Sequence, residues 1–297
     1  MSVPNVHRAA SFLTAVTVVT AAALAGVAAA GEQNAPVDLA GLLARIGDRV
    51  EAYYARAQSI ICLETVHLQP MDFNFASSPH TRRLVYELRV SWERATGTDA
   101  MPEANVLRQL KTVDGRPPKP NEEPGCLDPK PVALDPLSFL LPQHQVEYTF
   151  SYKGKGRTDG REAVMIDYGP AGKPPSEFTW HDTCVSINVP TRTTGRVWID
   201  SATGDVLRVD ERVLGPIAVD VPEAQRRKGA SSPLTLDRAD TSIRYKAIAF
   251  TDPDEMVLLP QSIESMTLIR GSGAPRLRTT QAFSGYQRFV TGARLIE

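Results

Sequence analysis

The chain has 297 residues, of which 42% are hydrophobic and 23% charged, with 20 Gly, 23 Pro and 3 Cys. This composition excludes a collagen-like, a disordered or a disulfide-framework protein. The formal net charge of -1 lacks the basic excess of a nucleic-acid-binding domain, so we expect no nucleic acid among its partners.

Residues 1–30 have the three parts of a secretory signal peptide. Arg8 is the only charged residue among them, an uncharged apolar stretch starts at Ser11, and a run of alanines ends at Ala30. We therefore predict export and cleavage near Ala30, which places the mature protein in the periplasm or outside the cell. A retained membrane anchor is the alternative, because the uncharged stretch reaches the roughly 20 residues that a spanning helix needs.

Helical patterns occur in two segments. Within residues 31–57, apolar residues recur three and four positions apart between Val37 and Ala57, which predicts an amphipathic helix of about five turns. Residues 131–141 favour a second, short helix, with Asp135 as its N-cap and a proline in its first turn.

Residues 58–297 otherwise have the patterns of β-strands. Apolar and polar residues alternate from Leu84 to Trp92 and from Val146 to Tyr152, so each of these strands has one apolar and one polar face. Turn residues at 158–160 lead to a strand that contains Ile166. Further strands are expected at 59–68, 106–113, 185–189, 196–200, 206–213, 241–250, 256–269 and 278–289.

These strands predict one large antiparallel sheet. There are about ten to eleven of them, joined mostly by short turns and without an alternating βαβ rhythm. Such a sheet curls or closes to protect its edges, and its apolar face needs a cover, which the two predicted helices supply. The predicted fold class is mainly β (α+β), with a helical segment at 31–57 and a single sheet domain at 58–297.

The sequence has no recognisable catalytic motif. Residues 154–157 (Gly-Lys-Gly-Arg) superficially suggest a phosphate loop, but the Walker spacing is missing and we expect a turn between strands. His181, Asp182 and Cys184 crowd three potential metal ligands together, yet neighbouring strand residues point to opposite faces and chelate jointly only at a bend. We therefore expect no enzyme, no metal and no cofactor; an envelope enzyme built on these residues is the least favoured alternative.

Three cysteines in an exported chain allow at most one internal disulfide. Cys62 lies in an apolar stretch and is expected to be a small buried hydrophobic residue. Cys126 lies in a loop and Cys184 begins a predicted strand, so a bridge between these two is the expected pairing.

The inward-type strand positions form the candidate ligand-binding surface. In a β-sandwich such residues are simply packed core. A single curved sheet under a helix can instead leave an apolar cavity that suits an acyl chain. The candidate positions are Leu84, Tyr86, Leu88, Val90, Trp92, Val146, Tyr148, Phe150, Tyr152 and Ile166.

Two stretches of the chain resemble a known family. Residues 195–200 (Gly-Arg-Val-Trp-Ile-Asp) and 204–209 (Gly-Asp-Val-Leu-Arg-Val) are similar to a strand–turn–strand block of LolA-like proteins, the periplasmic superfamily of outer-membrane lipoprotein-sorting and carrier proteins. The stretch from Leu259 to Phe289 is similar to the closing strands of uncharacterised bacterial relatives. The resemblance implies an open antiparallel half-barrel with helices over its concave apolar side, which binds lipid or lipoprotein acyl chains or acts as a sensor.

The leading hypothesis is a monomeric, non-enzymatic protein that binds lipid or lipoprotein acyl chains in a half-barrel. The alternative is a structural, interaction or sensor module of the cell envelope, with a filled interior and no small ligand.

Overall fold

The computed structural model describes residues 37–288 except 58, 73, 75, 94–102, 121, 123–136, 182–183, 228–231, 252–253 and 272–275. The predicted signal peptide therefore lies outside the described residues, as do Cys126, Asp135 and Asp182. Within the described part, no helix has the length and hydropathy to cross a membrane.

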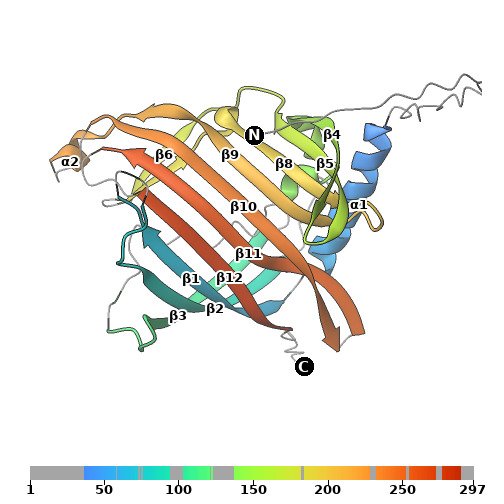
Figure 1. Cartoon of the computed structure of the whole chain (residues 1–297), viewed down its shortest axis with the longest axis horizontal. Coiled ribbons are helices and arrows are strands. Elements are labelled where there is room, and N and C mark those ends of the chain that lie inside the picture. Colours follow the sequence, from blue (N-terminus) through green and yellow to red (C-terminus); the bar gives the residue numbers. More distant parts are fainter. Residues whose placement is uncertain are drawn as a thin grey trace, which may run out of the picture. The chain divides into compact units, whose positions relative to one another are not determined.

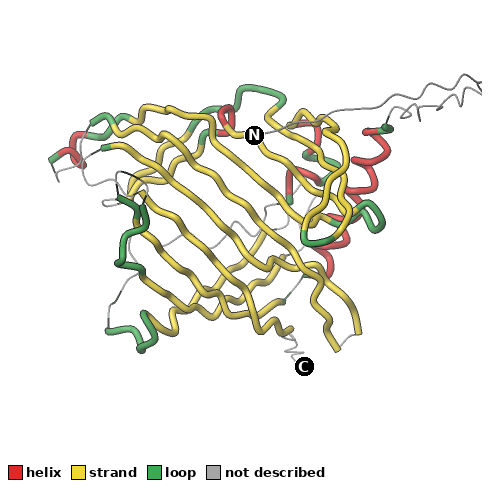
Figure 2. The backbone as a smooth tube through the Cα atoms, viewed as in Figure 1, coloured by secondary structure: helices red, strands yellow, loops and turns green. Residues whose placement is uncertain are grey.

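Strands make up most of the described backbone, as Figure 2 shows. The described helices and strands, in chain order, are α1 (Leu39–Arg56), β1 (Ile60–Pro70), β2 (Arg82–Glu93), β3 (Glu103–Val113), the 3-10 turns Ser138–Leu140 and Gln145–Glu147, β4 (Tyr148–Thr158), β5 (Arg161–Pro170), β6 (Glu177–His181), β7 (Cys184–Asn188), the 3-10 turn Pro190–Arg192, β8 (Thr193–Asp200), β9 (Val206–Val219), α2 (Glu223–Arg226), β10 (Leu234–Thr251), β11 (Asp254–Arg270) and β12 (Arg276–Arg288).

Ten strands form one open, curved antiparallel sheet in the order β3-β2-β1-β12-β11-β10-β9-β8-β5-β4 (Figure 1). The first and last strands of the chain, β1 and β12, pair in the middle of this order. The remaining strands, β6 and β7, pair with each other in a small separate sheet. The predicted fold class is confirmed: the described residues are mainly β, and the large sheet is antiparallel and not closed into a barrel.

The predicted amphipathic helix is confirmed as α1. It begins after Asp38, whose carboxylate accepts a hydrogen bond from the backbone N–H of Gly41 at 2.9 Å and thereby caps the helix. Ile46, Val50 and Tyr54 recur at helical spacing and are buried in the same cluster as side chains of the large sheet. The apolar stripe of α1 thus covers one face of the sheet.

The 3-10 turns that follow β3 add to the cover that α1 provides. The predicted second helix is, in its described part, only the 3-10 turn Ser138–Leu140, in which Phe139 and Leu140 are buried in the main cluster. The side-chain amide of Gln145 donates to the carbonyl oxygens of Leu43 in α1, at 3.1 Å, and of Leu140, at 2.8 Å. These bonds fix the 3-10 turns against α1.

The register of the sheet aligns apolar residues of different strands on the covered face. Ile166 pairs with Val197, Val197 with Val209, Val209 with Ile243, and Ile243 with Ile263. All five are buried. We call this line of five residues the apolar row. It runs from β5 to β11 and forms the surface on which α1 and the 3-10 turns pack.

Two local predictions were wrong. Residues 154–157 lie inside β4 instead of forming the turn, which is made by Asp159 and Gly160, both at positive φ. The pattern was misleading because Gly154 sits at a register shift in the strand, with φ 109°, a conformation that glycine adopts without strain. The second is an omission, since no strand was predicted at residues 177–181, where the structure has β6.

Candidate ligand-binding site

A cavity of about 1130 Å³ opens on the covered face of the sheet. Val209, Ile243 and Ile263 of the apolar row line it, and aromatic side chains from the cover and from the sheet form a wall. Phe139 stacks on Tyr168 with ring centroids 4.1 Å apart. The cavity therefore has an apolar floor and an aromatic side, and residues 170–174 lie at its margin.

Polar residues form a second line beside the apolar row. Glu211 pairs with Thr241, Thr241 with Ser265, and Ser265 with Thr279 across β9 to β12. Glu211, Thr241 and Ser265 line the cavity. We call these four residues the polar row. Because each lies two positions from a residue on the covered face, the polar row faces the same side of the sheet.

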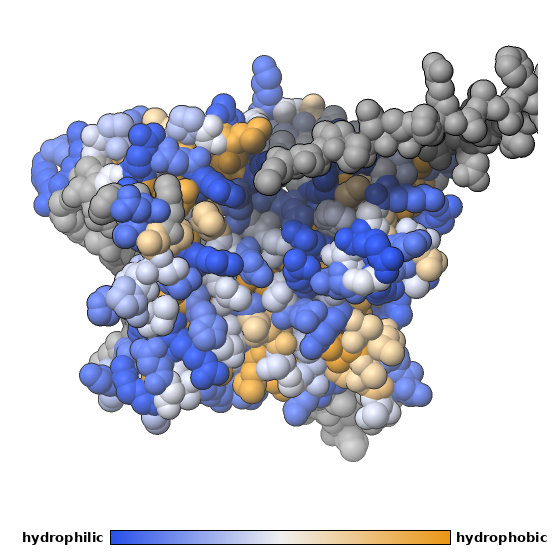
Figure 3. Space-filling view, in the orientation of Figure 1, coloured by the Kyte–Doolittle hydropathy of each residue, from blue (hydrophilic) through white to orange (hydrophobic). Residues whose placement is uncertain are grey.

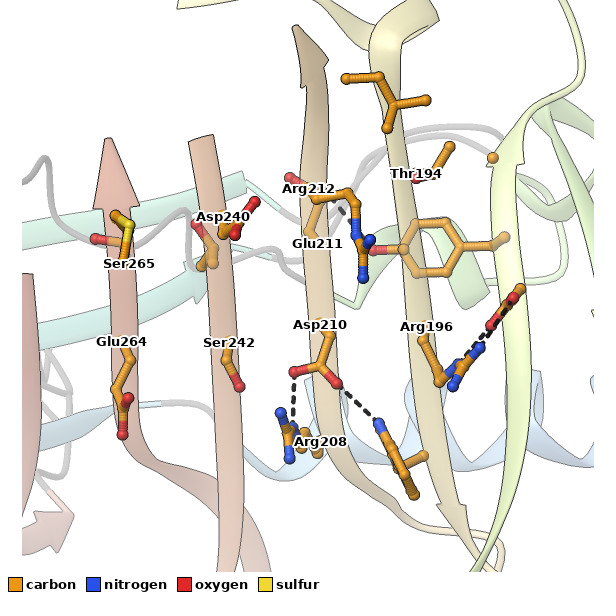
Figure 4. A pocket seen from close by; sticks show the side chains of 18 of the residues that line it. Thr194, Arg196, Arg208, Asp210, Glu211, Arg212, Asp240, Ser242, Glu264 and Ser265 are labelled. Atoms are coloured by element: carbon orange, nitrogen blue, oxygen red, sulfur yellow. Dashed lines mark hydrogen bonds and ion pairs between the residues drawn. The ribbon is translucent and has the colours of Figure 1, made fainter. Parts of the chain in front are cut away.

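Glu211 owes its position to a glycine. Tyr168 and Glu211 both pair with Gly195, and a Cβ on Gly195 would come within 2.2 Å of the Tyr168 ring. Only glycine lets the Tyr168 ring lie across β8, where its hydroxyl donates to a carboxylate oxygen of Glu211 at 3.3 Å. Figure 4 labels Glu211 on β9, beside the strand that carries Arg196.

Burial by the surrounding protein raises the pKa of the Glu211 carboxyl, and the hydrogen bond from Tyr168 acts in the opposite direction. Solvent nevertheless reaches this residue, which is exposed. Glu211 therefore lies at the solvent-exposed margin of the cavity, next to the apolar part of the cavity lining. Desolvation, with the neighbouring Glu211 charge, also raises the pKa of Tyr168, so its hydroxyl stays protonated as a donor.

A buried charge cluster lies on the same face, nearer the β3 edge. Glu64 is 1% exposed and accepts two hydrogen bonds from Arg108, Nε to Oε2 at 2.8 Å and Nη2 to Oε1 at 3.1 Å. The side-chain amide of Gln281, a cavity-lining residue, donates to Glu64 Oε1 at 2.7 Å. The guanidinium of Arg108 lies 3.7 Å from the centroid of the Tyr86 ring. These contacts compensate the buried carboxylate.

Side chains on the opposite face of the sheet line a polar hollow of about 970 Å³, which shares Tyr168, Glu211, Thr241 and Ser265 with the cavity. Its charged side chains neutralise one another: Arg196 donates to Asp167 at 2.6 Å, and Asp210 accepts from Arg208 at 2.7 Å and from the Trp198 indole at 2.9 Å (Figure 4). Figure 3 shows hydrophilic side chains over most of the face in view, with apolar residues in separate patches. Among the described residues, no three His, Cys, Asp or Glu side chains come together as metal ligands.

The predicted candidate residues are distributed over several environments. Val146 and Tyr148 line the cavity. Val146 was expected at an inward strand position, but it lies in the 3-10 turn Gln145–Glu147 and is 79% exposed, because β4 begins only at Tyr148. The side chain of Trp92 lies outside the described residues. Tyr148 also packs against the main cluster, as does Phe150, while Leu88, Val90 and Ile166 are buried within it. Leu84 and Tyr86 are buried in a separate cluster, and Tyr152 is half-buried.

Most of the cavity floor was not predicted from the sequence. Val209, Ile243 and Ile263 lie in predicted strands, but they were not among the predicted site residues. Their signal was the same period-two alternation that selected β2 and β4. The polar cavity residue Glu211 interrupts that alternation on its strand and therefore had no signal of its own.

Cys62 is buried and free, as predicted, and burial raises the pKa of its thiol to about 12, with a further contribution from the Glu64 charge. Cys126 and the side chain of Cys184 lie outside the described residues, so their pairing stays a prediction. The side chain of His181 and all of Asp182 also lie outside them, so the alternative of an enzyme built on these residues stays untested.

Neither a family model nor a curated protein matches the chain. Solved structures match it over most of its length at low identity. A putative outer membrane lipoprotein-sorting protein domain from Vibrio parahaemolyticus is 11% identical, with 84% of this chain and 93% of that chain covered and a TM-score of 0.37. A DUF1329 family protein from Desulfovibrio piger is 10% identical, with 85% and 92% covered and a TM-score of 0.37.

A LolA superfamily protein from Nitrosomonas europaea is 9% identical, with 85% of this chain and 96% of that chain covered and a TM-score of 0.34. The matches include the LolA superfamily.

Proposed function

We propose that this protein is an exported, non-enzymatic binding protein that holds the acyl chain of a lipid or lipoprotein in the cavity on the covered face of its sheet. The observation that carries the proposal is the cavity itself. It is about 1130 Å³ in volume, slightly more than the roughly 300–1,000 Å³ typical of small-ligand sites. Val209, Ile243 and Ile263 of the apolar row lie in its floor, and apolar surface that contacts hydrocarbon there gains roughly 25 cal/mol per Å².

The way the face is covered supports the same function. Ile46 and Val50 of α1 and Leu140 of the 3-10 turn Ser138–Leu140 pack in one cluster with buried side chains of the sheet and so cover part of the face. The part lined by Ile263 and Ser265 stays open. A curved sheet with a cover on only part of its concave side leaves room for a chain that the protein does not supply.

An interaction or sensor module with a filled interior is the second candidate. It is favoured by the main cluster, in which Ile243, Tyr245 and Ile263 are each at least nine-tenths buried. On this reading the cavity is a surface depression without a ligand, and the protein acts through a partner.

Fluorescent fatty acid uptake by the purified protein, together with native mass spectrometry for co-purified lipid, separates the two. Ser265→Trp places a bulky side chain in the cavity, and Glu264→Trp places the same side chain on the opposite face of β11 as a matched control. We expect Ser265→Trp to weaken uptake at least tenfold and Glu264→Trp to leave it unchanged. Absence of both uptake and co-purified lipid in the unmodified protein would refute ligand binding and favour the interaction module.

A further inference from the structure

We propose that the polar row selects the head group of the bound amphiphile, and that it favours a hydroxyl- or amine-bearing head over an anionic one. The inference rests on the proposed function, since it concerns the polar end of the same ligand. It is carried by the position of the polar row beside the apolar row and by the hydrogen-bonding chemistry of its side chains.

The change from apolar to polar lining occurs at the same place on three neighbouring strands. On each strand the two residues are two positions apart, so they face the same side and lie about 7 Å from each other along the strand. An acyl chain lying on the apolar row therefore brings its head group to the polar row. The pairs are Val209 and Glu211 on β9, Ile243 and Thr241 on β10, and Ile263 and Ser265 on β11.

The side chains at this border offer mainly acceptors. Glu211 presents a carboxylate, and among the described residues its hydrogen-bond partner is the Tyr168 hydroxyl, with no ion pair to a basic side chain. The amide nitrogen of Gln281 is used by Glu64, which leaves its amide oxygen for other donors. Thr241 and Ser265 can donate or accept. A head group with O–H or N–H donors satisfies this set, whereas a carboxylate or phosphate meets a like charge.

Two other charged side chains line the cavity. Glu147 is paired with His144 at 2.8 Å, and Lys173 is exposed in the segment after β5. Glu147 adds a second acid to the rim. Lys173 carries the only positive charge among the described lining residues, so it is the group that would reverse the selectivity if it, and not Glu211, met the ligand head. Burial, which raises the pKa of Glu211, adds to the cost of placing an anion beside it.

Competition between amphiphiles of one chain length tests the inference. The purified protein is loaded with the fluorescent apolar probe N-phenyl-1-naphthylamine, which is then displaced by monolauroylglycerol, dodecylamine or laurate below their micelle concentrations at mildly alkaline pH. We expect laurate to bind about tenfold more weakly than the other two, as one neighbouring like charge in partly screened surroundings implies. Glu211→Gln should remove the difference, and Glu264→Gln, on the opposite face, should retain it.

The outcomes distinguish this inference from the proposed function. Displacement by all three amphiphiles with equal affinity, or a laurate deficit that persists in Glu211→Gln, would overturn head-group selection and leave acyl-chain binding intact. A preference for laurate that is lost in Lys173→Gln would also overturn it, by assigning the head group to the lysine. Failure of the probe to bind and of every amphiphile to bind would refute the proposed function itself.

Discussion

Removal of Arg108 is expected to leave a buried carboxylate on the covered face without its counter-charge. The Arg108 side chain is 10% exposed and that of Glu64 is 1% exposed, so water cannot replace the lost guanidinium. The pair also spans β2, since Arg108 lies on the edge strand β3 and Glu64 on β1. Removing one partner of a buried ion pair typically costs about 3–5 kcal/mol, because the remaining charge is left uncompensated. We therefore predict that Arg108→Met lowers the free energy of unfolding by about that amount.

Urea denaturation at neutral pH measures this loss, provided that the slope of the transition stays the same. Two controls make the result specific. Arg89→Met removes an arginine from the exposed side of β2, where its ion pair with Glu87 is half solvated, and should cost less than about 1 kcal/mol. The double variant Glu64→Gln/Arg108→Met removes the buried charge together with its partner and should recover at least half of the loss. A loss below about 1 kcal/mol in Arg108→Met would refute the reasoning.

Three further predictions concern the cavity and its surroundings. The folded-state pKa of Glu211 is raised, so the unmodified protein loses stability as the pH rises from the ordinary glutamate value of about 4.3 through the folded-state pKa. Glu211→Gln should therefore melt at a higher temperature than the unmodified protein near neutral pH and at the same temperature below about pH 4. Thermal scans at both pH values measure the difference. Cys62, with its thiol pKa of about 12, should resist iodoacetamide at mildly alkaline pH until urea unfolds the protein, which peptide mass spectrometry detects; rapid labelling in the folded state would contradict its burial. Gly195→Ala forces the Tyr168 ring to move and should cost about 1–3 kcal/mol in urea denaturation, with no cost expected if the ring does not lie across β8.

Much of the fold was accessible from the sequence because most strands bury only one face. In β2 the buried Leu84, Tyr86, Leu88 and Val90 alternate with more exposed residues, which is the pattern that water on one side imposes. The same reasoning fails for β6. Its Phe178 is 38% exposed and its Trp180 is only partly buried, against the small cluster of Val219, Val221 and Leu234, so the strand lacks the regular burial that produces an alternating sequence.

The site was less accessible because it depends on contacts between distant parts of the chain. Gln281 and Glu64 are 217 positions apart and hydrogen-bonded, and they meet because β12 pairs with β1. A succession of hairpins predicts neighbours along the chain, but it does not predict that the last strand returns to the first. Without that pairing, Glu64 is one of several polar residues in its strand, with Thr65 and His67 close by, and nothing marks it as part of a site.

The register of the strands brings together polar residues that each interrupt the apolar alternation of their own strand. In β9 the alternation on the covered face continues through Val209 and then meets Glu211, and in β10 it runs through Ile243 after Thr241. On each strand alone, the polar residue is a single departure from the pattern and has no interpretation. Pairing places Glu211 beside Thr241 and continues the line to Ser265, so that the departures coincide at one depth of the cavity. Three coincident departures beside an intact apolar row are what an amphiphilic ligand requires, whereas a fully packed core would be expected to continue the apolar alternation at all three positions.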